Sequence, residues 1–154
     1  MFKKFVVLGA VAVAMAMPVA AQDFNASPNY ETVQLRGGFP DDPYIVYLSS
    51  GGGVDASNLG GGCRGYIANA PDVRLNFEPG SLPLIISAAS GADTTLVINA
   101  PDGRWYCDDD SGEGLNPSVL FSNPQYGRYE IWVGTYGNAQ LYDAELHISE
   151  LYSQ

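Results

Sequence analysis

Beyond an apolar N-terminal stretch, short runs of β-branched and aromatic residues alternate with turn residues along the whole chain. No segment after residue 21 repeats its hydrophobic positions with the period of an amphipathic helix. Short strands with turn signals between them are the pattern of an all-β sandwich or barrel. We predict strands over residues 31–35, 44–49, 65–68, 73–77, 82–88, 94–99, 105–107, 118–122, 127–135 and 142–150.

Strict alternation in the last two runs indicates how the strands are buried. Tyr129, Ile131 and Val133 share one face of their strand, and residues 144–148 alternate apolar with polar in the same way. This is the pattern of an antiparallel sheet with one face on the core. The predicted fold is therefore a single antiparallel, jelly-roll-like β-sandwich. Residues 49–62, with six glycines, are predicted to be a mobile loop.

The N-terminus has the organisation of a secretory signal peptide. Lys3 and Lys4 precede an apolar run over residues 5–17, and a small-residue cleavage site ends at Ala21. The run is too short for a membrane span. We therefore predict a signal peptide over 1–21, a flexible leader over 22–29 and one sandwich domain over 30–152, in a periplasmic or secreted protein.

Removal of the signal peptide leaves five arginines, no lysine and 17 acidic residues, which gives a net charge of −12. Such a surface repels nucleic acid and anionic lipid and attracts cations. Solubility alone is the simpler explanation of the charge. The only cysteines, Cys63 and Cys107, are predicted to form a disulfide, because an even count in an oxidising compartment favours pairing.

A glycine-rich acidic loop follows the predicted strand at 105–107. It crowds several oxygen donors into nine residues, and a further aspartate precedes the neighbouring strand. Hard cations such as Ca²⁺ take six to eight oxygen ligands. The loop does not match an EF-hand, and a solvated acidic turn is the alternative. The candidate calcium ligands are Asp93, Asp108, Asp109, Asp110, Glu113 and Asn116.

Residues 73–151 resemble the bacterial pre-peptidase C-terminal (PPC) domain, a β-sandwich appended to many secreted proteases. The resemblance rests on a leucine-rich strand with a Pro101-Asp-Gly turn, the Asp-rich glycine loop after it, and the Gly127-Arg-Tyr-Glu-Ile-Trp-Val strand. It implies a non-catalytic accessory module, with calcium held by Asp93 and residues 108–110. No protease domain precedes residue 73, and residues 30–70 are expected to add strands to the same sandwich.

Aromatic side chains beside the acidic loop suggest a second kind of site. Trp105, Tyr106 and Tyr126 flank the loop and could stack on sugar rings, although aromatic residues of a sandwich usually serve as packing. Peptidase chemistry is the alternative, because Asp110-Ser111-Gly112 partly matches the motif around a trypsin-like serine. The only histidine, His147, follows that serine, against the order in such enzymes.

We therefore expect a non-catalytic exported module that recognises a protein or a glycan of the envelope or exterior. The alternatives are a small secreted serine-peptidase-like hydrolase, or a partner or inhibitor of a separate secreted protease.

Overall fold

Eleven strands and one short 3-10 helix form within residues 22–154, the part of the chain that this computed structural model describes. The predicted signal peptide lies outside the described residues. The elements are β1 (Glu31–Arg36), β2 (Tyr44–Ser50), β3 (Val54–Asp55), η1 (Ala56–Leu59), β4 (Tyr66–Ile67), β5 (Val73–Glu78), β6 (Leu84–Ser90), β7 (Thr94–Asn99), β8 (Trp105–Asp108), β9 (Ser118–Phe121), β10 (Gly127–Thr135) and β11 (Tyr142–Ser149).

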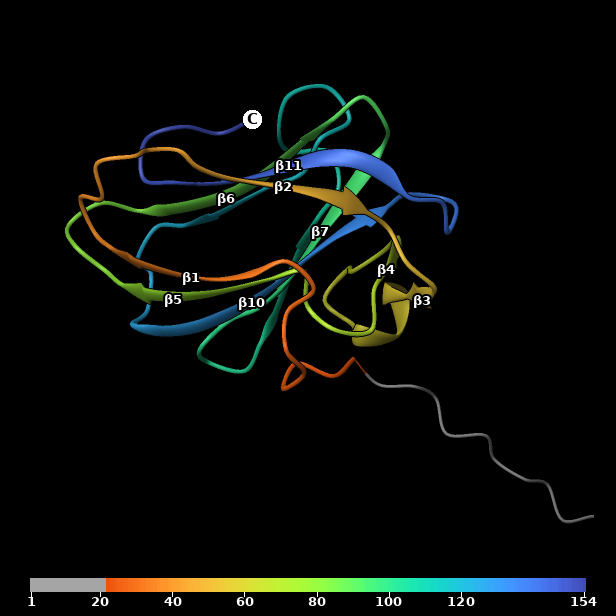
Figure 1. Cartoon of the computed structure of the whole chain (residues 1–154), viewed down its shortest axis with the longest axis horizontal. Helices are drawn as coiled ribbons and strands as arrows, with labels where there is room; N and C mark the ends of the chain where they lie inside the picture. Colours follow the sequence, from red (N-terminus) through yellow and green to blue (C-terminus); the bar gives the residue numbers. More distant parts are fainter. Residues whose placement is uncertain (1–21) are drawn as a thin grey trace, which may run out of the picture.

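The strands form two sheets that face each other (Figure 1). Sheet A has seven strands: the path β1-β5-β10-β4-β3, with β7 and then β8 pairing on the other side of β10. Sheet B has four strands in the order β2-β11-β6-β9. The predicted all-β sandwich is confirmed, and its sheets are dominated by antiparallel pairs. One pairing departs from it, because β1 runs parallel to β5.

The main core lies between the sheets and comes from alternate residues of each strand. Tyr129, Ile131 and Val133 of β10 point into it, as their alternation predicted, and Leu146 and Ile148 of β11 face them from sheet B. Burial of each side chain of this size stabilises the folded protein by about 1.5–3 kcal/mol.

A second, smaller core lies on the outer face of sheet A. Trp132, which alternation turns away from the main core, is fully buried there because the segment from β3 to β4 folds over it. The expected mobile loop at 49–62 is therefore wrong in part: it contains β3 and η1. Asp55 accepts a hydrogen bond from the Ser57 backbone N at 2.9 Å and so caps η1.

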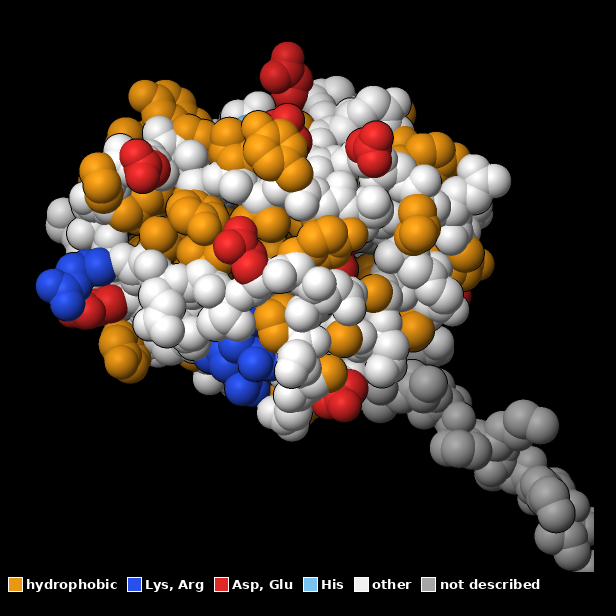
Figure 2. Space-filling view, viewed as in Figure 1, with side chains coloured by type: hydrophobic (Ala, Val, Ile, Leu, Met, Phe, Trp, Pro, Cys, Tyr) orange, Lys and Arg blue, Asp and Glu red, His pale blue; other side chains and the backbone are white. Residues whose placement is uncertain are grey.

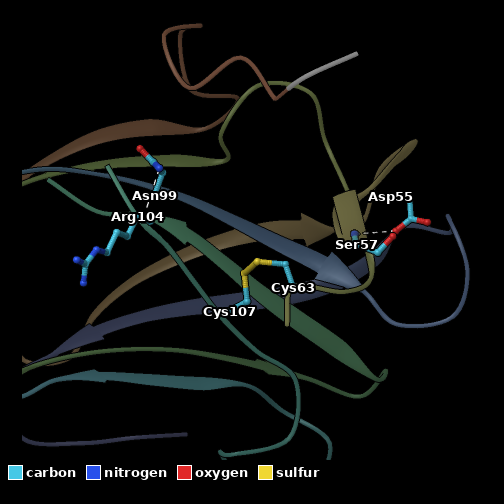
Figure 3. Close-up of a disulfide and its surroundings, with 6 residues drawn as sticks. All are labelled: Asp55, Ser57, Cys63, Asn99, Arg104 and Cys107. Carbon is cyan, nitrogen blue, oxygen red and sulfur yellow. Dashed lines mark hydrogen bonds between the residues drawn. A yellow bond between two sulfur atoms is a disulfide. The ribbon is translucent and has the colours of Figure 1, made fainter. Parts of the chain in front are cut away.

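The disulfide predicted between Cys63 and Cys107 is present and attaches this covering segment to β8 (Figure 3). Its two Cα atoms are 5.0 Å apart. The cross-link thus joins the outer core to the sheet beneath it.

Residues 22–29, expected to be a flexible leader, instead contact the sandwich. The side chain of Gln22 is buried and donates to the Ala68 carbonyl at 3.1 Å. Arg74 on β5 donates to the Ala26 carbonyl at 2.8 Å. The leader is therefore held by specific polar contacts that its composition did not indicate.

Candidate functional site

The acidic loop connects β8 of sheet A to β9 of sheet B. Asp108, at its start, accepts hydrogen bonds from the Ser111 backbone N at 2.8 Å, the Ser111 Oγ at 2.6 Å and the Ser118 backbone N at 2.9 Å. Both of its carboxylate oxygens are thus engaged in shaping the loop. This aspartate acts as the organising side chain of the turn.

Other predicted calcium ligands are engaged separately. Asp109 lies 3.4 Å from Arg64, and the amide oxygen of Asn116 accepts from the Ser90 backbone N at 3.0 Å. Asp110 and Glu113 are exposed. Within residues 22–154, no three Asp, Glu, His or Cys side chains form a group that could hold a metal ion.

Asp93, just before β7, is the predicted ligand whose environment is unusual. Its Oδ1 atom is buried and has no hydrogen-bond partner among the described residues. Burial raises the pKa of Asp93, and the carboxylates of Asp110 and Asp109 raise it further. The three carboxylates therefore repel one another, and calcium binding stays a prediction.

The three predicted stacking residues do not form one platform. Trp105 and Tyr106 are consecutive in β8 and so point to opposite faces of the sheet. Trp105 packs on Trp132 with 5.5 Å between ring centroids, and Tyr106 packs edge-on against Phe121 at 5.0 Å. Both are half-buried, whereas Tyr126 is 75% exposed. Only Tyr126 offers an open ring.

The candidate peptidase residues are bonded to other groups. The Ser111 Oγ donates to Asp108, whereas the His147 Nε2 lies 3.0 Å from Glu145. Alternation along β11 places His147 on the polar, outer face of the strand, yet it is only 5% exposed, because the chain after β11 turns back over the outer face of sheet B (Figure 1). There the Gln154 backbone N donates to Ser87 at 3.1 Å.

Asp72 is a buried carboxylate that sequence reasoning did not single out. It lies just before β5, at 2% exposure, and accepts from the Val133 backbone N at 2.9 Å and the Asn29 amide at 3.0 Å. Pairing between β10 and β5 ends at Ile131. The Val133 N–H therefore has no partner on β5, and Asp72 accepts its hydrogen bond instead. Burial raises its pKa from 3.8 to about 6.

This pKa makes Asp72 a source of pH-dependent stability. Because its pKa is higher in the folded state, the folded protein binds more protons between pH 4 and pH 6, so stability falls as pH rises through this window. Moving a pKa from 3.8 to about 6 corresponds to about 3 kcal/mol. Urea unfolding between pH 4 and pH 7 should show a smaller loss of stability for Asp72→Asn than for wild type. Equal losses in the two proteins would contradict this assignment.

A groove around Tyr126 on the outer face of sheet A was also missed from the sequence. It has a volume of about 540 Å³. Three residues on each of β1 and β5, together with the start of β10, line it. Recognising it from sequence would have required the pairing register of three strands, of which β1 and β5 are parallel.

Among the residues that the structure describes, no helix is long and apolar enough to cross a membrane. No protein-family profile matches the chain, and no curated protein matches it. A search of solved structures finds the pre-peptidase C-terminal domain of a collagenase from Bacillus anthracis. The match has 17% sequence identity and a TM-score of 0.45, and it covers 80% of this chain and 100% of that chain. The matched structure is of the PPC family that residues 73–151 resemble in sequence.

Proposed function

We propose that the protein is a non-catalytic, exported accessory module that binds a protein or a polysaccharide outside the cytoplasm. The observation that carries the non-catalytic assignment is that the candidate nucleophile and the candidate base are each bonded to another group. The Ser111 Oγ is used to hold Asp108, and His147 is buried beside Glu145. The Cys63–Cys107 disulfide supports export, because such bonds persist in oxidising compartments.

A fluorogenic peptide library tests the catalytic alternative. We expect no hydrolysis above the buffer rate, in wild type and in Ser111→Ala alike. Hydrolysis by wild type that Ser111→Ala abolishes would overturn the proposal. Fractionation of the producing cells, followed by pull-down from the envelope and from the medium, tests the export and binding parts. Retention of the protein in the cytoplasm would contradict export.

We further propose that calcium stabilises the acidic loop by drawing together Asp93, Asp109 and Asp110, which do not form a metal-binding group in the structure without the ion. The orphaned Oδ1 of Asp93 and the mutual repulsion of the three carboxylates favour a cation here. Asp108 and Asn116 would contribute by holding the loop, since their oxygens already accept hydrogen bonds.

Millimolar Ca²⁺ is expected to raise the melting temperature relative to EDTA, because an ion that binds only the folded state stabilises it. Asp109→Asn and Asp110→Asn should be nearly neutral in EDTA and should abolish the calcium effect. Asp41→Asn, at an exposed aspartate of another loop, is the control that should keep it. Calorimetry that shows the same melting temperature in calcium and in EDTA would remove calcium from the proposal.

A further inference from the structure

The groove around Tyr126 is lined by polar side chains that the strand register places in two rows. Gln34 of β1, Asn76 of β5 and Arg128 of β10 are direct cross-strand neighbours. Two residues further along the sheet, Arg36 pairs with Glu78. Side chains two residues apart lie on the same face of a sheet, so both rows line the same outer surface.

The amides of this surface are available to a ligand. Neither Gln34 nor Asn76 makes a side-chain hydrogen bond with any other residue of 22–154. Arg36 and Glu78 lie 3.1 Å apart in an exposed pair, which is weak and leaves further donors and acceptors. Together these side chains offer planar groups that donate and accept side by side.

Tyr126 borders these rows, and the chain on either side of it is fixed. The buried Tyr129 hydroxyl accepts from the Gln125 backbone N and donates to the Gln125 carbonyl, both at 2.9 Å. On the other side, Gly127 has a φ of +139°, and a Cβ there would lie 3.0 Å from Pro101. The exposed ring is therefore presented by an anchored turn, which reduces the ordering cost of binding.

The charges of the groove favour an uncharged ligand. Arg36 is paired with Glu78, and Arg128 already contacts the buried Glu130, whose Oε1 it shares with Arg74 at 2.9 Å and 2.6 Å from the two Nε atoms. The chain as a whole has a net charge of −10 and repels polyanions. Figure 2 shows acidic side chains spread singly over the face in view, with basic side chains confined to small groups.

From this geometry we propose that the groove binds a neutral polysaccharide, with one sugar ring stacked on Tyr126 and neighbouring hydroxyls bonded to Gln34, Asn76 and Arg128. A sugar ring has an apolar C–H face that suits an aromatic ring and adjacent hydroxyls that suit planar amides. This inference rests on the proposed binding function and assigns a ligand class and a site to it.

Affinity electrophoresis of the disulfide-bonded protein tests the inference. The native gels contain hydroxyethyl cellulose, dextran, galactomannan or mixed-linkage β-glucan, with alginate as polyanion and chitosan as polycation. We expect at least one neutral polysaccharide to retard the wild type. Tyr126→Ala should weaken that binding about tenfold, and Tyr126→Phe should largely keep it. Asn76→Ala should also weaken it.

Tyr47→Ala is the matched control, because Tyr47 is 72% exposed but lies on β2 of sheet B. It should bind as wild type does. Migration unaffected by all four neutral polysaccharides, retardation by alginate or chitosan alone, or an equal loss in Tyr47→Ala would each overturn the inference. A protein partner captured from the envelope, with no neutral polysaccharide bound, would overturn the groove assignment and leave the binding function in place.

Discussion

Cys63→Ser is expected to lower the free energy of unfolding by about 4 kcal/mol under oxidising conditions. The disulfide closes a loop between cysteines 44 residues apart, and its loss returns that loop's conformational freedom to the unfolded chain. The variant also releases the covering segment from β8, so the outer core around Trp132 should open more readily.

Urea unfolding monitored by tryptophan fluorescence measures this effect. Cys107→Ser and the double variant should match Cys63→Ser, because each removes the same bond. In reducing buffer all four proteins should converge, apart from the small cost of exchanging sulfur for oxygen. A difference between wild type and Cys63→Ser of under about 1 kcal/mol in oxidising buffer would show that the cross-link contributes little.

The strands were largely predictable because local chemistry separates them. The Pro101-Asp-Gly turn, for example, is closed by a hydrogen bond from the Arg104 backbone N to Asp102 at 3.0 Å, and β7 and β8 begin and end close to the predicted positions. The pairing of β1 with β5 was not predictable, since nothing local in β1 specifies its neighbour. Parallel partners are chosen by the global topology.

The covering segment shows why a glycine-rich stretch can mislead. Its apolar residues are few, and the prediction of a mobile loop follows from that composition. Val54, Ala56 and Leu59 nevertheless suffice to cover Trp132. The segment folds over sheet A because Trp132 lies on the outer side of β10 and has to be buried. Predicting this from sequence requires knowing which residues of β10 face outward.

The two candidate sites also differ in how far the sequence could predict them. The acidic loop is contiguous in sequence, so its presence was predictable, but the use of Asp108 as an internal acceptor was not. The Tyr126 groove combines three strands that are distant in sequence, so its residues are brought together only by register. Surface sites assembled across a sheet therefore escape motif reasoning.

Trp132→Ala is expected to cost about 3–5 kcal/mol, the usual loss when a large buried aromatic side chain is removed. Trp132 is fully buried and packs against Trp105, so its removal leaves a cavity under the covering segment. Trp132→Phe is the sharper comparison. The Nε1 atom of Trp132 is buried and has no hydrogen-bond partner within residues 22–154. Losing that N–H removes an unsatisfied donor, so phenylalanine should cost clearly less than alanine.

The double variant Cys63→Ser/Trp132→Ala should lose less stability than the sum of the two single changes. Both changes act on the same small core: Trp132 fills it, and the disulfide holds its cover in place. Without Trp132 the covering segment buries less apolar surface, so anchoring that segment through the disulfide stabilises the protein less. Residues in contact commonly show coupling of about 0.5–3 kcal/mol. Strict additivity in a urea double-mutant cycle would mean that the cross-link acts on the unfolded chain alone, with no part in packing the outer core.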